Sequence, residues 1–380
     1  MTKLKKITKK RQEYLDTLQD ACNKNYINQL SDDFILSVPC DIYHNCINDF
    51  YTEQIVDRVF EYYRNQGFPY YNMNDADILY EYNKFMKYDM SQLLINDTEL
   101  NQIMHGLNIT NGFFPNMWSV KCRNMLTPKE IFDSDDKFKL AIRKRIKMSD
   151  SPLKPYNIRK SIKIFSGAQS VSGFRPSIAK FLVEHLFKTN ENISILDPCM
   201  GWGGRMFGFC VSDKTKQYVG FDVATETING LNNLKIKMNN LGIFKNKDID
   251  IIKMPFEDSE SILKKYNAFD FIMTSPPYFN VEKYSTDSDQ SFLRYNSYTK
   301  WVEGFLRPMI EISYNCLATD GYMALNVGSG KIYDETYAIM EDVFGEIYKV
   351  YNMRLSKLCG TGVNKLTTKF KHEPIIVCKK

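Results

Sequence analysis

The sequence lacks the features that mark several classes of protein. No run of apolar residues approaches the ~18 that a transmembrane helix needs, and the lysine-rich beginning has no apolar segment of the kind found in signal peptides. The nine cysteines include no Cys-x-x-Cys pair, so neither a zinc site nor a disulfide framework is indicated. Internal repeats and low-complexity segments are also missing. These absences predict a soluble cytoplasmic protein with no membrane partner and no metal. The richness in Asn, Lys, Ile and Tyr is typical of an AT-rich genome, which indicates a bacterial cell or a viral host.

Charge is unevenly distributed along the chain, although the net charge is only +5. Residues 31–100 contain thirteen acidic side chains against four basic ones, whereas Lys137–Lys163 contains ten basic side chains against one acid. A second basic segment, Arg354–Lys371, has five basic residues and no acid. Segments of this kind form either ordinary solvated faces or phosphate-binding surfaces. We expect the acidic segment to avoid nucleic acid.

The chain is long enough for one large or two ordinary domains, since 43% of its 380 residues are hydrophobic. Residues 1–160 have mainly helical patterns and many aromatic side chains, and a Ser- and Pro-containing linker follows Met148. From residue 161 onward, short apolar strands alternate with amphipathic helices. The sequence therefore predicts a helical domain over 1–160 and an α/β domain over 161–380.

The second region predicts a mostly parallel sheet, because strands that alternate with helices form βαβ units. A final hairpin would bring the number of strands to seven, with residues 356–372 as the long loop between the last two. The predicted strands are Ile193–Pro198, Gln217–Val223, Asp248–Phe256, Phe269–Ser275, Tyr322–Val327, Tyr348–Leu355 and Glu373–Cys378. A single long helix is predicted over Ser297–Leu317.

Two loops follow buried strands and carry the chemistry. The first reads Asp-Pro-Cys-Met-Gly-Trp-Gly-Gly from Asp197 to Gly204. Its three glycines allow a tight turn and a close approach of the backbone to a ligand. The pattern is not Gly-x-Gly-x-x-Gly, the fingerprint of dinucleotide binding. Asp197 would accept hydrogen bonds from an ammonium group, which favours S-adenosylmethionine over a diphosphate cofactor.

The second loop is Thr274-Ser275-Pro276-Pro277-Tyr278. Two prolines fix φ and remove two N–H donors, which leaves rigid carbonyl acceptors. The Ser275 hydroxyl adds an acceptor and Tyr278 adds an aromatic face. Acceptors beside a stacking ring suit a planar base with an exocyclic amino group, such as cytosine or adenine.

With these two loops the chain resembles the amino-methyltransferases of DNA, whose hallmarks are Asp-Pro-Phe-x-Gly-x-Gly and (Asp/Asn/Ser)-Pro-Pro-(Tyr/Phe). The resemblance covers residues 161–380. It implies an α/β, Rossmann-like, seven-stranded class I methyltransferase sheet with S-adenosyl-L-methionine as cofactor. The base would be flipped out of the duplex and methylated directly, with Ser275, Pro276, Pro277 and Tyr278 as the catalytic residues. The serine is more similar to the cytosine-N4 group than to the adenine-N6 group.

The resemblance also implies a set of cofactor-binding residues. Asp222, at the tip of the second strand, would bind the ribose hydroxyls, although an acid there can equally cap the next helix. Phe174 would cover the methionine end of the cofactor, or belong to the core. Either Glu257 or Asp258 would meet the adenine amino group. The full predicted set is Phe174, Asp197, Pro198, Gly201, Gly203, Gly204, Asp222, Phe256, Glu257 and Thr274.

Double-stranded DNA is the partner that the resemblance implies. Target recognition would reside in residues 1–160, helped by the loops 279–296 and 356–372, because no recognition region follows the final strand. The basic segments then become a DNA-binding surface, and a cognate restriction endonuclease is a further candidate partner of a monomer or homodimer. The predicted DNA-binding residues are Arg143, Lys144, Arg145, Lys147, Arg159, Lys160 and Lys365.

Three alternatives remain at this point. The chain could be an adenine-N6 DNA methyltransferase. It could be an RNA or protein-glutamine methyltransferase, although those carry Asn or Asp where Ser275 stands. It could also be a catalytically silent nucleic-acid-binding or viral structural subunit with the same fold, although such a subunit would not need intact cofactor and proline loops.

Overall fold

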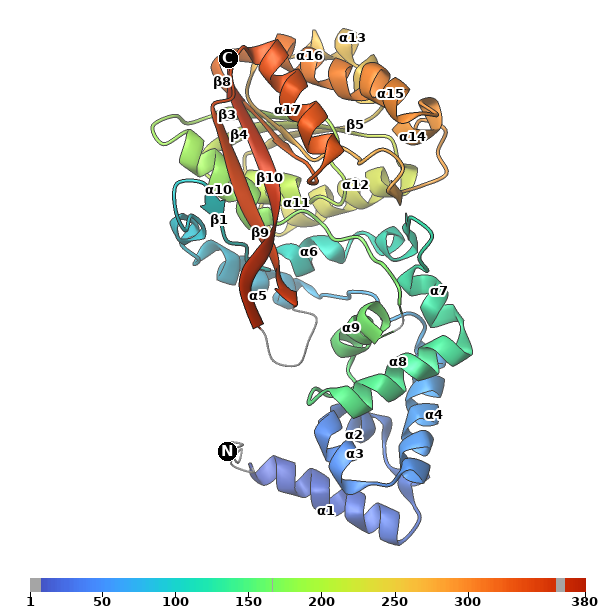
Figure 1. The fold of residues 1–380 in the computed structure, drawn as a ribbon. Coiled ribbons are helices and arrows are strands. Elements are labelled where there is room, and N and C mark those ends of the chain that lie inside the picture. Colours follow the sequence, from blue (N-terminus) through green and yellow to red (C-terminus); the bar gives the residue numbers. More distant parts are fainter. Residues whose placement is uncertain (1–7, 166, 360–365) are drawn as a thin grey trace. The chain divides into compact units, whose positions relative to one another are not determined.

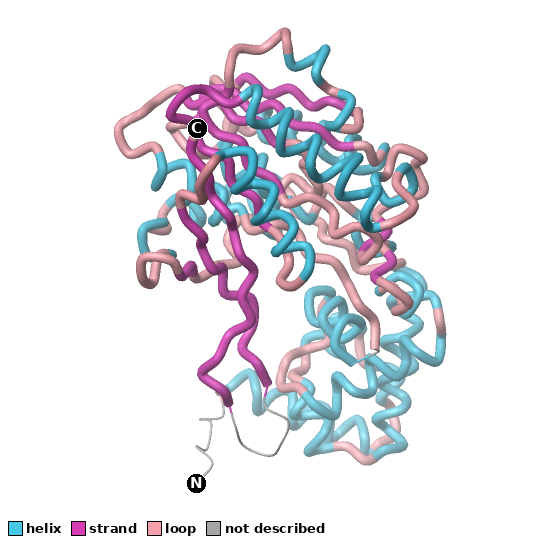
Figure 2. The backbone as a smooth tube through the Cα atoms, turned by 45° about the horizontal axis from the view of Figure 1, so that its top comes forward, coloured by secondary structure: helices cyan, strands magenta, loops and turns pink. Residues whose placement is uncertain are grey.

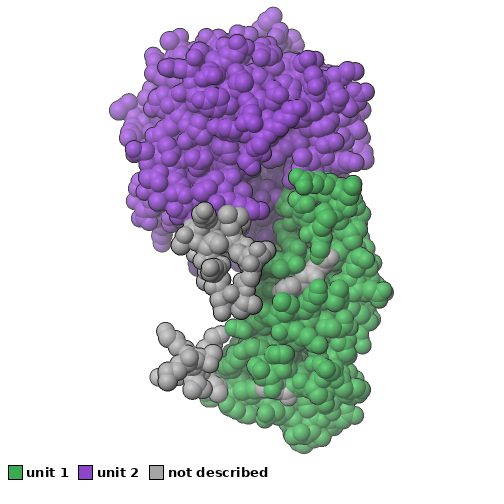
Figure 3. All heavy atoms as spheres, viewed as in Figure 1, with its two compact units in different colours: residues 1–70, 118–171 green, residues 71–117, 172–380 purple. Residues whose placement is uncertain are grey.

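The computed structural model describes residues 8–165, 167–359 and 366–380. It divides into two compact units, drawn in two colours in Figure 3. The first comprises residues 1–70 and 118–171, and the second comprises residues 71–117 and 172–380. The predicted division at residue 160 therefore differs from the division in the structure, because residues 71–117 pack with the α/β region. No helix among the described residues is both long enough and apolar enough to cross a membrane.

The second unit contains one large sheet with the strand order β1-β9-β10-β8-β6-β3-β4-β5 (Figure 2). Strand β10 runs antiparallel to both of its neighbours, whereas the pairs β1–β9, β3–β4, β3–β6, β4–β5 and β6–β8 are parallel. The strands are β1 (Glu99–Leu100), β3 (Ile193–Asp197), β4 (Thr215–Asp222), β5 (Asp248–Lys253), β6 (Phe269–Thr274), β8 (Leu317–Asn326), β9 (Lys349–Cys359) and β10 (Leu366–Lys379). The short strand β7 (Glu282–Lys283) lies outside this sheet.

Both faces of the sheet are buried, because alternate side chains of each strand enter different cores. Ile195 and Phe271 pack into one hydrophobic cluster, whereas their neighbours Leu196 and Ile272 pack into the other. The first face is covered by α5 (Asp75–Met86), α10 (Pro176–Leu186), α11 (Gly204–Cys210) and α12 (Thr225–Asn240). The second is covered by α13 (Glu260–Leu263), α15 (Tyr298–Trp301), α16 (Arg307–Cys316) and α17 (Lys331–Phe344). The result is the expected three-layer α/β domain (Figure 1).

Seven strands were expected in the sheet and eight are present. The additional strand, β1, pairs in parallel with β9 through Glu99 opposite Asn352. Only two residues long, β1 gives no alternating pattern from which a strand can be predicted. Two strands also extend into the predicted loop 356–372, because β9 continues to Cys359 and β10 begins at Leu366.

The predicted helix Ser297–Leu317 is interrupted. A π-helical turn, Val302–Leu306, separates α15 from α16. Pro308 at the start of α16 cannot donate a backbone hydrogen bond, which favours such an irregularity just before it. The remaining elements of this unit are α6 (Leu107–Asn111), α14 (Ser291–Arg294) and the 3-10 turns Met90–Leu93 and Phe256–Asp258.

The first unit is helical, as expected. Its helices are α1 (Lys9–Asn23), α2 (Asp32–Ser37), α3 (Cys40–Cys46), α4 (Asp49–Gln66), α7 (Pro128–Asp133), α8 (Asp135–Met148) and α9 (Pro155–Phe165). It also holds the 3-10 turn Ile27–Gln29 and the short strand β2 (Lys121–Cys122). The chain passes from the second unit back to the first within the 3-10 turn Pro115–Ser119. Thr127 and Glu130 form a capping box at α7, which fixes the start of that helix.

Candidate active site

The two sequence loops lie at one place on the sheet. Strands β3 and β6 are parallel neighbours, with Leu196 opposite Ile272, so their carboxyl ends meet at the same edge. The strand order reverses here, since β4 and β5 lie beyond β3 and β8 lies beyond β6. Such a switch point opens a crevice in which ligands of α/β sheets bind. The backbone N–H of Cys199 donates to Thr274 Oγ1 at 3.0 Å, which joins the two loops directly.

The glycines of the first loop differ in what surrounds them. Gly201 has φ +56° and open space where a side chain would begin. A Cβ at Gly203, which has φ +67°, would lie 2.8 Å from Leu234, and one at Gly204 would lie 2.1 Å from the carbonyl oxygen of Phe174. Gly203 and Gly204 therefore allow tight packing of the chain on itself. Gly201 is the position where the loop leaves room for a ligand.

Asp197 is fully buried, and its carboxylate is engaged by the chain itself. One oxygen accepts from Arg205 Nε and from the Tyr218 hydroxyl, both at 2.8 Å. The other accepts from Arg205 Nη2 at 3.2 Å and from the Cys199 N–H at 3.3 Å. Four donors satisfy the four acceptor sites of a carboxylate. This geometry favours a positioning role for Asp197 over the predicted contact with an ammonium group.

Asp222 lies at the end of β4 and holds the glycine loop. Its carboxylate accepts from the Gly201 N–H at 2.9 Å and from the Ala224 N–H at 3.0 Å. Burial raises the pKa of Asp222 to about 6, against the lowering effect of these backbone hydrogen bonds. Asp222 is not the N-cap residue of α12, which is Ala224. Asp222 instead connects the carboxyl end of β4 to the open glycine.

Phe256 and Glu257 follow β5 in a 3-10 turn. Phe256 is 1% exposed and packs edge-on against Phe221, so it belongs to the core. The Glu257 side chain is 5% exposed, whereas that of Asp258 is 49% exposed. Glu257 is therefore the acid that faces inward, which the sequence left undecided. Burial raises the pKa of Glu257, and it accepts from Arg294 at 2.8 Å.

The segment 279–295 touches three of the predicted cofactor loops, a feature that the sequence did not reveal. The Tyr284 ring packs against Trp202 of the glycine loop at 5.5 Å between centroids. The Asp287 carboxylate accepts from the Thr225 N–H at 2.9 Å, at the start of α12. Arg294 pairs with Glu257. The only local signal was the number of aromatic and charged side chains that this polar segment carries.

The second loop is closely packed. Thr274 is fully buried, Pro276 is buried, and Ser275 and Pro277 are half-buried. The Tyr278 hydroxyl donates to Glu373 Oε1 at 2.8 Å, and burial raises the pKa of the Tyr278 phenol well above its ordinary value. Pro198, another predicted cofactor residue, directly follows β3 and is buried. The ring of Phe174, which is half-buried, lies 5.3 Å from the Arg205 guanidinium.

The predicted DNA-binding residues lie in the first unit, apart from Lys365, which is outside the described residues. Helices α4 and α8 pair an acidic stripe with a basic one. Arg143 binds Glu53 through two hydrogen bonds of 2.6 Å, and Lys139 binds Asp57 at 2.8 Å. We call this set, with Lys147–Asp49 at 3.8 Å and Arg64–Asp135 at 2.8 Å, the α4–α8 ion-pair ladder. The ladder thus pairs Lys139, Arg143 and Lys147 of the basic segment with acidic side chains of α4.

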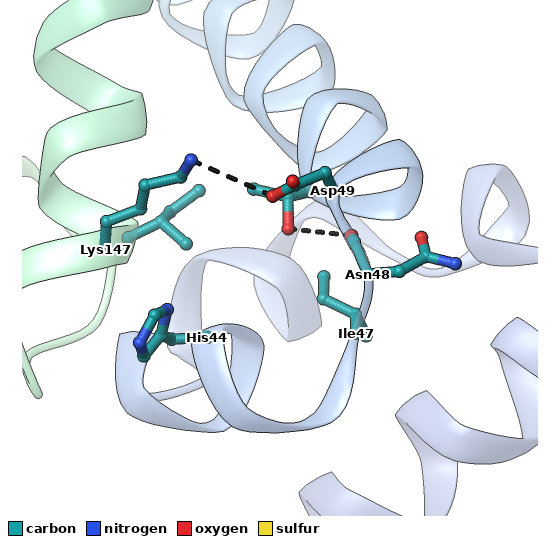
Figure 4. Close-up of a pocket in the computed structure, with 7 residues that line it drawn as sticks. His44, Ile47, Asn48, Asp49 and Lys147 are labelled. Carbon is teal, nitrogen blue, oxygen red and sulfur yellow. Dashed lines mark hydrogen bonds and ion pairs between the residues drawn. The ribbon is translucent and has the colours of Figure 1, made fainter.

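Two of the residues predicted to contact DNA are instead buried in the first unit. Arg145 is 4% exposed and donates to Asn157 at 2.8 Å. Arg159 is 7% exposed and donates to the Pro69 carbonyl at 2.7 Å. Lys160 is exposed and Lys144 is half-buried. Lys147 is exposed and lines a shallow pocket with His44 and its ion-pair partner Asp49 (Figure 4). Lys160 and Lys147 are therefore the exposed members of the predicted set.

Comparison with known proteins gives a family match at the second loop. Residues 269–380 match a family model described as DNA methylase, which spans the Ser-Pro-Pro-Tyr loop and strands β6 to β10. S-adenosylmethionine is the methyl donor of that family, in agreement with the cofactor expected from the sequence. A comparison with curated proteins gives no match.

Several solved methyltransferase structures are similar to part of this chain. A SAM-dependent methyltransferase from Agrobacterium tumefaciens is 14% identical and covers 57% of this chain and 65% of its own, with a TM-score of 0.39. A precorrin-6y C5,15-methyltransferase from Geobacter metallireducens is 12% identical and covers 53% and 88%, with a TM-score of 0.35. The fold assignment itself comes from the strand order. The strand order shows an α/β fold with a mostly parallel sheet, and residues 269–380 of this fold match the DNA methylase family model.

Proposed function

We propose that this protein is a site-specific DNA methyltransferase that moves a methyl group from S-adenosylmethionine to the exocyclic amino group of a flipped-out base. Cytosine N4 is the first candidate. Adenine N6 is the second, because the matching family model bears the names of both N6 and N4 enzymes. The observation that carries the proposal is the hydrogen bond between Cys199 and Thr274, which joins the glycine loop to the Ser-Pro-Pro-Tyr loop at the switch point of the sheet.

The residues around the glycine loop fit the methyl donor. The open space at Gly201 gives room for a ligand beside the backbone, and the carboxylates of Asp222 and Glu257 lie at the end of β4 and in the turn that follows β5. We assign Asp222 to the ribose hydroxyls and the region of Glu257 to the adenine. Segment 279–295 contacts all three loops and would enclose the cofactor. When bound, the cofactor supplies an electrophilic methyl group.

The Ser-Pro-Pro-Tyr loop would hold the base. A base within a duplex is out of reach, so it must be extruded at a cost of a few kcal/mol. Tyr278 stacks on the extruded base, which contributes about 1–3 kcal/mol in comparable complexes. The Ser275 hydroxyl and the Pro276 carbonyl accept from the amino group, and these bonds turn its lone pair toward the methyl group. The amino nitrogen would attack the methyl carbon as the bond from that carbon to sulfur breaks, S-adenosylhomocysteine would leave, and the nitrogen would lose one proton to solvent.

No thiol nucleophile is needed for this direct displacement. Cys199 is the cysteine nearest to the site in sequence, and burial raises its pKa well above the ordinary value for a thiol. Since the thiolate is the reactive form, Cys199 stays protonated and unreactive at neutral pH. Catalysis then depends on positioning, which the rigid prolines and the packed loop favour.

The test uses labelled S-adenosylmethionine with duplex DNA, followed by digestion to nucleosides. We expect labelled N4-methyldeoxycytidine, whereas N6-methyldeoxyadenosine would identify the second candidate. Ser275→Ala and Tyr278→Ala should each reduce the rate by on the order of a hundredfold, since they remove groups that position the base. Ser91→Ala, at an exposed serine of the same unit, is the control. Label found only in RNA or protein, or full activity of both loop variants, would contradict the proposal.

A further inference from the structure

Tyr278 is held by a residue far away in sequence. Its hydroxyl donates to Glu373 Oε1 at 2.8 Å, although 95 residues separate the two. The contact exists because β10 lies beside β8, which in turn lies beside β6. Glu373 sits on β10, two residues before Ile375, which faces Asn326 at the end of β8. The sheet thus brings a carboxylate to the tip of the Ser-Pro-Pro-Tyr loop.

A second constraint on the Tyr278 ring comes from the backbone that follows β8. A Cβ at Gly328, two residues beyond the end of that strand, would lie 3.2 Å from Tyr278 Cε2. The ring therefore passes close to the backbone after β8, while its hydroxyl is bound to β10. Because the ring is fixed at its edge and at its end, rotation about χ1 would break the hydrogen bond or bring the ring into the Gly328 backbone.

We propose that Glu373 is a positioning residue for methyl transfer: it fixes the Tyr278 ring in the plane against which the flipped-out base stacks. This inference rests on the proposed function. It adds a residue that lies outside both sequence motifs. Stacking geometry would then depend on the state of one carboxylate on β10.

The groups around Glu373 affect the pKa of its carboxyl group and so the pH at which it is charged. Groups from four elements face it: Tyr278 after β6, Asn326 on β8, Glu282 on β7 and Arg175 before α10. Burial raises the pKa of Glu373, and the nearby Glu282 adds to the increase, whereas Tyr278, Asn326 and Arg175 oppose it. A phenol donates more strongly to an ionised carboxylate than to a neutral one. The ring is therefore held best above the raised pKa of Glu373.

The test compares Glu373→Gln, Tyr278→Phe and the double variant with the wild type. The controls are Tyr266→Phe and Asp250→Asn, at another tyrosine–carboxylate hydrogen bond of 2.8 Å whose two residues belong to neither loop. We expect each site variant to lose kcat on the order of ten- to a hundredfold through misplacement, and the double variant to lose no more than either single variant. KM for the cofactor should stay constant. The wild-type rate should rise with pH through the pKa of Glu373, and Glu373→Gln should lose this dependence.

Two results would overturn the inference. One is wild-type kcat in Glu373→Gln, and the other is a double variant whose loss equals the product of the two single losses. The same four proteins are also unfolded in urea, a measurement that needs no activity. If the wild type transfers no methyl group to DNA, the proposed function fails. The unfolding measurements in urea then test by themselves whether Glu373 restrains Tyr278. Non-additive changes in midpoint support the Glu373–Tyr278 restraint, and additive changes reject it.

Discussion

Asp222 is a carboxylate that holds the fold and that we propose also binds a ligand. It already accepts from two backbone N–H groups, yet burial raises its pKa to about 6 from the ordinary 3.8. The folded protein therefore keeps this proton until about pH 6, whereas the unfolded chain releases it near 3.8. Ionised Asp222 thus costs stability, and this cost grows as pH rises from 3.8 to 6 and is complete above 6.

A ribose that donates hydrogen bonds to Asp222 would stabilise its ionised form. We therefore expect the affinity for S-adenosylmethionine to increase between about pH 5 and pH 7, by about tenfold for each unit by which binding lowers the pKa. Calorimetric titration of the wild type and of Asp222→Asn measures this effect. The variant should bind weakly at every pH, and Asp213→Asn, at an exposed aspartate, should behave as the wild type. A flat wild-type profile would remove Asp222 from the cofactor site.

At the scale of elements, helices α4 and α8 explain what the two charged segments do. Their ion-pair ladder places Glu53 and Asp57 of α4 opposite Arg143 and Lys139 of α8. The spacing of four residues on each helix puts successive charges on one face. Acidic and basic segments that are separate in sequence thereby become a single interface, so a basic run does not by itself indicate a DNA-binding surface.

The ladder predicts different effects for two basic residues. Arg143→Ala and Glu53→Ala should each lower the free energy of unfolding by up to about 1 kcal/mol, with non-additive effects in the double variant. Lys160→Ala, on the exposed side of α9, should leave stability unchanged. In DNA-binding titrations against salt, Lys160→Ala should reduce the slope by about one and Arg143→Ala by less. Equal slopes for both variants would show that Arg143 contacts phosphate in spite of its ion pair.

At the scale of the whole molecule, residues 71–117 belong with the methyltransferase sheet. Phe114 shows why. Its ring is fully buried, and it lies where a Cβ at Gly203 would approach within 3.3 Å and one at Gly230 within 2.6 Å. These two glycines lie in the cofactor loop and in helix α12. The helical segment therefore completes the core beneath the predicted cofactor site.

Phe114→Ala should consequently destabilise the protein by about 3–5 kcal/mol, the usual cost of a large cavity. Urea unfolding followed by tryptophan fluorescence measures the change. Tyr80→Ala is the control, because Tyr80 lies in the same unit with 68% of its surface exposed, and its loss should stay within about 0.5 kcal/mol. A small effect of Phe114→Ala would mean that residues 71–117 add little to this core.

Much of the sheet could be predicted from local patterns. Strand β6 is predicted over Phe269–Ser275 and spans Phe269–Thr274, and strand β4 is predicted over Gln217–Val223 and spans Thr215–Asp222. A buried strand or an amphipathic helix shows its hydrophobic period within a few residues, so each can be predicted from its own segment of the sequence. Strand β1 could not be predicted, because two residues carry no period and its pairing with β9 depends on a partner some 250 residues away.

The sequence by itself determined the α/β class, the order of the main elements and the two loops that end β3 and β6. These are local properties, since an apolar strand followed by glycines or prolines behaves in the same way in any domain. Only the tertiary structure decided which side chains serve the site and which serve the fold. The sequence predicts that Asp197 binds the cofactor and that Arg145 binds DNA, yet both are buried and bound by the chain itself. Glu373 carries no motif and reaches Tyr278 because three strands lie side by side. Burial and pairing depend on what the rest of the chain places around a residue, which no local pattern contains.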